Sequence, residues 1–140
     1  MLHSVPRGSR GGGVGLLSKK ALRVKYCSIA KRQFKSFAYV ELSLNYLSTN
    51  LKIVIEYRPP PSPSNQSTVV LFYNVFPILL ERLVTASGSL LIADDFNLHV
   101  NDVRDTTATR FLQLIESFNL KQHVWEPTHR NGHILDFIDY

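Results

Sequence analysis

The residues best suited to chemistry form a polar segment that directly follows an apolar run. Residues 90–93 are Leu, Leu, Ile and Ala, Asp94 and Asp95 come next, and Asn97 follows two residues after Asp95. Residues two apart on an extended chain point to the same side, so Asp95 and Asn97 can face one site. A carboxylate can accept a proton from water, and an amide can hold that water or a phosphate oxygen. Taken alone, the pattern favours an ordinary strand-end turn rich in Asp and Asn.

Alternating apolar residues predict the strands that would position this segment. Two half-buried strands are expected at 38–44 and 51–57, antiparallel to each other. Short apolar runs predict further strands at 13–17, 89–92 and 134–138. Residues 1–12 are expected to be a flexible N-terminal segment, residues 18–35 are ambiguous, and loops are expected at 59–68, 94–105 and 121–132.

Apolar residues at helical spacing predict two helices, over 72–83 and 108–118. Pro77 would either kink the first helix or lie in its first turn, with Asn74 as the N-cap. Asp105 or Thr106 would cap the second helix. The order of elements is that of a mixed α/β domain spanning residues 13–140.

Composition bounds the class of protein. The chain has 140 residues, of which 44% are hydrophobic and 19% charged, as expected of one globular domain and not of a disordered chain. Neither a bilayer-spanning apolar run nor a secretory signal peptide is recognisable. Cys27 is the single cysteine, which excludes an internal disulfide. We therefore expect an intracellular protein that is not secreted. A nuclear compartment is a separate expectation.

Charge is unevenly distributed along the chain. Nine of the 16 Lys and Arg residues lie between Arg7 and Lys35, and no acid precedes Glu41. A basic first third suits a polyanion such as DNA, because neutralisation of phosphates dominates nonspecific affinity. A solvated basic surface is the alternative interpretation.

Four segments in the same order resemble one family. They are residues 10–17 (RGGGVGLL), 57–60 (YRPP), 95–100 (DFNLHV) and 127–136 (PTHRNGHILD). Together they resemble the endonuclease/exonuclease/phosphatase superfamily, in the version found in the apurinic-type endonuclease domains of LINE (non-LTR) retrotransposons. The resemblance extends over residues 10–138. It implies an α/β fold, a DNase I-like four-layer sandwich.

The resemblance also implies roles for four residues. Tyr57 matches a tyrosine that contacts the scissile phosphate, Asp95 a carboxylate that activates water, and Asn97 an amide that positions phosphate and nucleophile. Asp136 matches a carboxylate that orients a catalytic histidine. The structural alternatives are a buried tyrosine for Tyr57 and a strand-end acid for Asp136.

The same resemblance implies the ligands. Arg58, His99 and Thr128 are expected to contact phosphate or DNA. The reaction would be in-line attack of water on a phosphodiester, with Mg²⁺ stabilising the charge on the phosphoryl oxygens.

The chain departs from the family pattern in ways that put catalysis in doubt. The family's metal-binding Glu lies before the glycine-rich segment, where this chain has no acid, and the final Asp-His pair lies beyond Asp136. We therefore expect a partial domain, without its N-terminal and C-terminal strands, that is inactive as this chain. Asp94 replaces a usual glycine, and its carboxylate would repel that of Asp95 unless the two face apart.

Other functions remain as alternatives. One is a phosphatase or phospholipase of the same superfamily, and another is a non-catalytic nucleic-acid-binding or degenerate product. The basic first third predicts weak, salt-sensitive binding of DNA. The loop histidines lack the partners that a zinc site needs, and no Gly-Lys-Ser/Thr follows the glycines, which excludes a nucleotide P-loop.

Overall fold

The computed structural model describes residues 1–6, 13–28, 34, 36–46, 49–60, 62, 68–132, 134 and 136–139. Its strands are β1 (Leu2–Pro6), β2 (Gly13–Leu17), β3 (Arg23–Ser28), β4 (Ala38–Tyr46), β5 (Thr49–Tyr57), β6 (Ser89–Asp95) and β7 (Asp136–Asp139). Its helices are α1 (Val69–Val84) and α2 (Thr106–Ser117).

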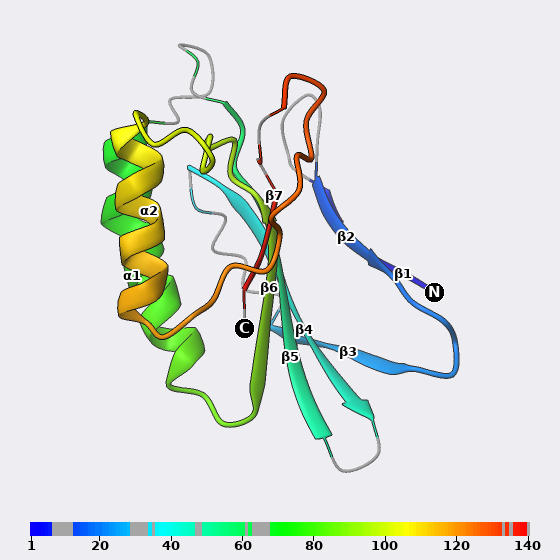
Figure 1. Cartoon of the computed structure of the whole chain (residues 1–140). Coiled ribbons are helices and arrows are strands. Elements are labelled where there is room, and N and C mark those ends of the chain that lie inside the picture. The colour runs from blue at the N-terminus through cyan, green and yellow to red at the C-terminus, as the bar shows by residue number, and fades with distance from the viewer. Residues whose placement is uncertain are drawn as a thin grey trace.

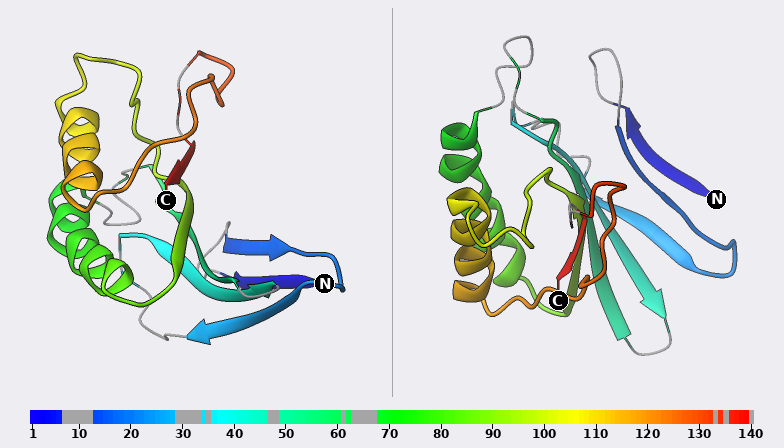
Figure 2. Two further views of the ribbon diagram at one scale, coloured as in Figure 1. Left: turned by 60° about the horizontal axis from the view of Figure 1, so that its bottom comes forward. Right: turned by 45° about the horizontal axis from the view of Figure 1, so that its top comes forward.

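The described elements form three layers. β3, β4, β5, β6 and β7 make a five-stranded sheet in that order, in which only the β5–β6 pair is parallel. β1 and β2 form a separate antiparallel pair. The two helices cover one face of the large sheet, and the β1–β2 pair lies on the other side (Figure 1). The two further views show the same separation (Figure 2).

Helix α1 begins earlier than the sequence suggested. Thr68 is the N-cap, and its Oγ1 accepts a hydrogen bond from the Leu71 N–H at 3.0 Å. The expectation that Asn74 caps the helix was wrong, and Pro77 lies inside it. The proline deprives the Tyr73 carbonyl of its usual intrahelical donor. The apolar side chains at 69–71 extend the helix backwards because Thr68 supplies the missing cap.

An aromatic core joins the helices to the sheet. Phe72 and Phe76 of α1 lie 4.8 Å apart between ring centroids, and Phe96, just after β6, lies 5.1 Å from Phe72. Phe111 of α2 lies 5.0 Å from Phe96. All four rings are buried. The position of the segment after β6 is therefore fixed by the packing of both helices.

A second core occupies the opposite face of the sheet. Val14 of β2 packs with Val40, Leu42 and Ile53 of the central strands.

On the helix side of the sheet, the buried carboxylate of Glu41 pairs with Arg82 of α1 at 2.9 Å and with Lys52 of β5 at 3.4 Å.

The mixed α/β prediction is confirmed, with differences in detail. The strands expected at 13–17, 38–44 and 51–57 are β2, β4 and β5, and β4 and β5 are antiparallel as predicted. Strands β1 and β3 were not predicted. β1 lies in the segment that was expected to be flexible. It was not predicted because its mixed polar and apolar residues show little periodicity and because its hydrogen bonds come from its partner, β2. Residues 7–12 lie outside the described residues.

The elements around the polar segment are longer or shifted. β6 continues to Asp95, so Asp94 and Asp95 belong to a strand and not to a loop. The final strand covers Asp136–Asp139. Asp105 caps α2, since its Oδ1 accepts from the N–H groups of Thr107 and Ala108 at 2.9 and 3.0 Å. Neither α1 nor α2, the helices in the described part of the chain, is long and apolar enough to cross a membrane.

Candidate functional site at the strand ends

Three of the four expected site residues occupy one row across the large sheet. Tyr57, the last residue of β5, pairs in register with Asp95, the last residue of β6. Asp95 in turn pairs with Asp136, the first residue of β7. Adjacent strands lie about 4.8 Å apart, so the three backbone positions are neighbours. The row lies at the end of the sheet where β5 and β6 terminate (Figure 1).

The alternation of side chains separates the two adjacent carboxylates. Tyr57 packs against the hydrophobic core on the β1–β2 side, as does Leu91 of β6. Asp95 lies four residues after Leu91 and therefore faces the same side. Asp94 faces the helices and is buried, as is Glu56, its neighbour in β5. The condition set by the sequence, that Asp94 and Asp95 face apart, is met.

Asn97 is held in place by two hydrogen bonds. Its backbone is in the left-handed region, with φ of 53°. Its Nδ2 donates to the Arg58 carbonyl at 2.9 Å, and its backbone N–H donates to Asp95 Oδ1 at 3.2 Å. Asn is among the residues that tolerate this conformation. The side-chain amide is thus fixed against the Arg58 carbonyl and the backbone N–H against the Asp95 carboxylate, and Asn97 Oδ1 makes no hydrogen bond to the described residues.

Arg58 lies on the helix side of the sheet and is 1% exposed. Its Nη1 donates to the Phe96 carbonyl at 2.9 Å, and its guanidinium carbon lies 5.1 Å from the centre of the Phe72 ring. Burial lowers the pKa of Arg58 from its usual value, although the nearby Tyr73 opposes this. A phosphate contact from Arg58 would require the guanidinium to leave this position. That contact remains a prediction.

Two loops flank the row, and Asn101 joins them. His99 and Thr128, the other expected phosphate contacts, are both exposed on these loops. Asn101 Nδ2 donates to the Gly132 carbonyl at 2.8 Å, and its Oδ1 accepts from the Ile134 N–H at 3.1 Å. Sequence reasoning missed Asn101, because a lone Asn in a polar loop gives no signal of a partner thirty residues away.

The described basic residues of the first third do not lie at this row. Its described members are Lys19, Lys20, Arg23 and Lys25, and all are exposed. Arg23 pairs with Asn45, near the end of β4 opposite to that of the row. The other five basic residues of this third lie outside the described residues.

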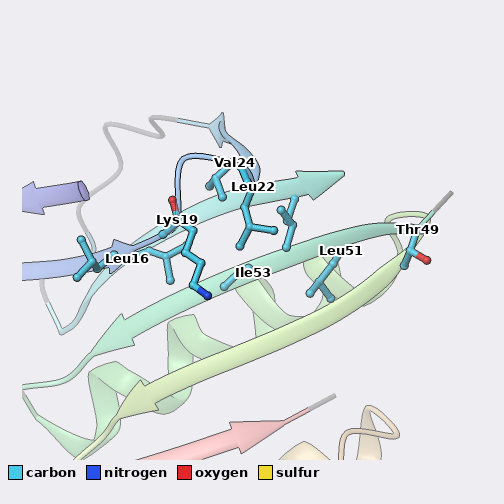
Figure 3. Close-up of a pocket in the computed structure, with 11 residues that line it drawn as sticks. Leu16, Lys19, Leu22, Val24, Thr49, Leu51 and Ile53 are labelled. Atoms are coloured by element: carbon cyan, nitrogen blue, oxygen red, sulfur yellow. The ribbon is translucent and has the colours of Figure 1, made fainter. Parts of the chain in front are cut away.

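Two pockets also lie away from the row. A pocket of about 810 Å³ lies on the β1–β2 side of the sheet (Figure 3), and a second, of about 560 Å³, lies at the C-terminal end of α2 beside the exposed Trp125. Figure 3 shows Leu16 and Lys19 facing Leu51 and Ile53 across the first pocket. Neither is lined by a residue of the row, so pocket volume does not locate the candidate site.

The described side chains of the site could supply part of the coordination of a divalent cation. Asp95 and Asn97 offer oxygen atoms, whereas Mg²⁺ takes octahedral oxygen coordination completed by further carboxylates, phosphates or water. Within the described part of the chain, no group of three or more His, Cys, Asp or Glu residues could hold a metal ion.

Comparison with known proteins supports the fold. No family model and no curated protein matches the sequence. Among solved structures, the endonuclease domain of TRAS1, a telomere-specific non-LTR retrotransposon, aligns with 99% of this chain at 11% identity and a TM-score of 0.59. A structure described as an acetyltransferase from Sphaerobacter thermophilus aligns with 80% of this chain and 73% of its own, at 13% identity, but its TM-score of 0.36 carries no argument.

This chain spans 65% of the length of the TRAS1 domain. Because the shared identity is so low, the likeness establishes architecture alone. The five-stranded sheet, the helix layer and the second, two-stranded sheet therefore have the DNase I-like α/β fold seen in that endonuclease domain.

Proposed function

We propose that this chain carries the phosphodiester-contacting part of a DNA endonuclease domain of the non-LTR retrotransposon type. The observation that carries the proposal is the row of Tyr57, Asp95 and Asp136 in register, with Asn97 fixed beside it. The fold shared with the TRAS1 endonuclease domain supports the same assignment. In open α/β sheets, ligands commonly bind beyond the carboxyl ends of the strands, where β5 and β6 end here.

The chemistry of each group suits a phosphodiester. Asp95 would accept a proton from the attacking water. Asn97, held through its Nδ2, would use its remaining amide atoms to orient that water or a phosphate oxygen. The hydroxyl of Tyr57 would donate to a phosphate oxygen, where negative charge develops during the displacement. By the same resemblance, Asp136 would orient a catalytic histidine.

Mapping of bound DNA tests the site. We would titrate the ¹⁵N-labelled 140-residue protein with a twelve-base-pair DNA duplex at low salt and follow the backbone amides by NMR. The largest shifts should fall on residues 57–58, 95–99 and 128–132. Shifts confined to β3 and the residues before it, which carry Lys19, Lys20, Arg23 and Lys25, would show that DNA is held by a diffuse basic surface instead.

The 140-residue polypeptide should bind DNA without cutting it. These residues include no acid before Glu41 and no histidine after His133. Incubated with supercoiled plasmid and Mg²⁺, the polypeptide should nick no more DNA than the Asp95→Ala variant or a reaction with EDTA. Nicking that requires both Asp95 and Mg²⁺ would contradict this expectation and would show that these 140 residues are sufficient for catalysis.

A further inference from the structure

Arg58 makes hydrogen bonds to three consecutive residues of the segment that carries the candidate site. Its backbone N–H donates to the Asp95 carbonyl, and its Nη1 donates to the Phe96 carbonyl, both at 2.9 Å. Its own carbonyl accepts from Asn97 Nδ2 at 2.9 Å. Arg58, the residue directly after β5, therefore fixes the backbone at Asp95 and Phe96 and the side chain of Asn97.

The two backbone contacts could form with almost any residue at position 58, so the bond that depends on the side chain is the one to Phe96. It is made inside the protein, where the guanidinium is 1% exposed and lies against the Phe72 ring. Arg58 Nε and Nη2 have no hydrogen-bond partner among the described residues. Burying such a cation is costly, and a charge-assisted bond in an interior of low dielectric is correspondingly strong.

The next residue shows what that bond stabilises. Asn97 has a φ of 53°, a left-handed conformation that Asn tolerates better than other non-glycine residues but that is still less favoured than a negative φ. Its neighbour Phe96 is held from two directions, by the aromatic core around its ring and by Arg58 at its carbonyl. If the carbonyl were released, the backbone at 96–97 could turn towards an ordinary conformation and carry the amide of Asn97 away from Asp95.

We propose that Arg58 is a positioning residue, which sets the geometry of Asp95 and Asn97 from the helix side of the sheet. This inference rests on the proposed function only for the role of the positioned groups, Asp95 and Asn97, in contacting the phosphodiester. It differs from a direct phosphate contact, because the guanidinium acts through the Phe96 carbonyl and stays buried when DNA binds.

The experiment compares Arg58→Met, which keeps the apolar stem, with Arg58→Lys, which keeps one charged donor. Arg104→Met is the matched control, since Arg104 is exposed and pairs with Asp102 in the neighbouring loop. Hydrogen exchange is measured by NMR under conditions in which every variant is folded. In Arg58→Met, exchange of the Asn97 N–H should accelerate about tenfold or more relative to the amides in the middle of α1. Arg58→Lys should recover most of the protection, and Arg104→Met should not alter it.

The same samples are titrated with the DNA duplex. The DNA-induced shifts at Asp95 and Asn97 should be lost in Arg58→Met, retained in Arg104→Met and largely restored in Arg58→Lys. Unchanged exchange at Asn97 in Arg58→Met would overturn the proposal. So would equal acceleration at all amides, because that is the signature of a residue that only stabilises the fold.

The two arms separate the two proposals. If the unaltered protein shows no DNA-induced shift at residues 95–97, the proposed function fails, while the exchange measurement still decides whether Arg58 positions Asn97. If that protein shows the shifts and Arg58→Met keeps them with unchanged exchange, the positioning role alone fails.

Discussion

Tyr73 links the two helices beneath the loop that follows the candidate site, and replacing it with Phe isolates that link. Its hydroxyl donates to the Thr107 carbonyl in the first turn of α2 at 2.7 Å, and the side chain is 7% exposed. Burial raises the pKa of Tyr73 to about 12, against an ordinary value of 10.0. The nearby Arg110 and Arg58 oppose the rise, and Asp105 adds to it.

The sign and size of the pH effect follow from these values. The folded protein favours the neutral phenol, so its contribution is complete below pH 10 and is lost as pH rises towards 12. A difference of about 2 pKa units corresponds to at most about 2.7 kcal/mol. Removing the hydroxyl costs about 1 kcal/mol of hydrogen bonding at neutral pH. Tyr73→Phe should therefore be less stable than the unaltered protein at pH 8 and more stable by pH 11.5. The free energies of unfolding of the two proteins should be equal at about pH 10.7.

Urea unfolding between pH 8 and 11.5, followed by circular dichroism, measures this difference. Lysines and the other tyrosines titrate in both proteins, so the difference between the two free energies of unfolding isolates Tyr73. Parallel curves over the whole range would refute the reasoning, because they would mean that the phenol is no harder to ionise in the folded protein than in the unfolded chain.

Three further predictions concern the cap of α2, the loops beside the row and a close backbone approach. Asp105→Ala removes both N-cap hydrogen bonds and should lower the free energy of unfolding by about 1 kcal/mol in urea titrations; a loss below a few tenths would contradict the cap. Arg130→Gln, on an exposed loop beside the row, should reduce the slope of log affinity against log salt for duplex DNA by about 0.9, whereas Lys25→Gln, on β3, should not. The reverse ranking would move the DNA to the β3 surface. Gly88→Ala should destabilise the protein by about 1 kcal/mol or more in thermal unfolding, since Gly88 has a φ of 103° and an added Cβ would lie 2.9 Å from the Asn50 carbonyl oxygen; an unchanged melting temperature would exclude that approach.

Local sequence signals were sufficient for most of the elements. The period-two patterns at 38–44 and 51–57 identified β4 and β5, and the helical spacing located most of α1 and α2. Local sequence patterns do not predict an element whose existence or start depends on contacts with another segment or residue. β1 exists because β2 supplies its hydrogen bonds, and α1 begins at Val69 because Thr68 caps it. A strand that gains its stability from a partner carries little of that information in its own residues.

The kinds of chemistry available were evident in the amino-acid residues, namely a strand-end carboxylate at Asp95, an amide at Asn97 and a tyrosine before a proline run at Tyr57. Which of these residues are neighbours depends on how the strands pair. Parallel pairing of β5 with β6 brings residues 57 and 95 into register across thirty-eight positions of chain, and no local preference encodes that distance. The pairing of the strands also determines where the Arg58 side chain lies. Side chains alternate along β5, and this alternation continues to Arg58, so that its side chain faces the helices. Register and sidedness are properties of the assembled sheet, and they decide which residues can act together.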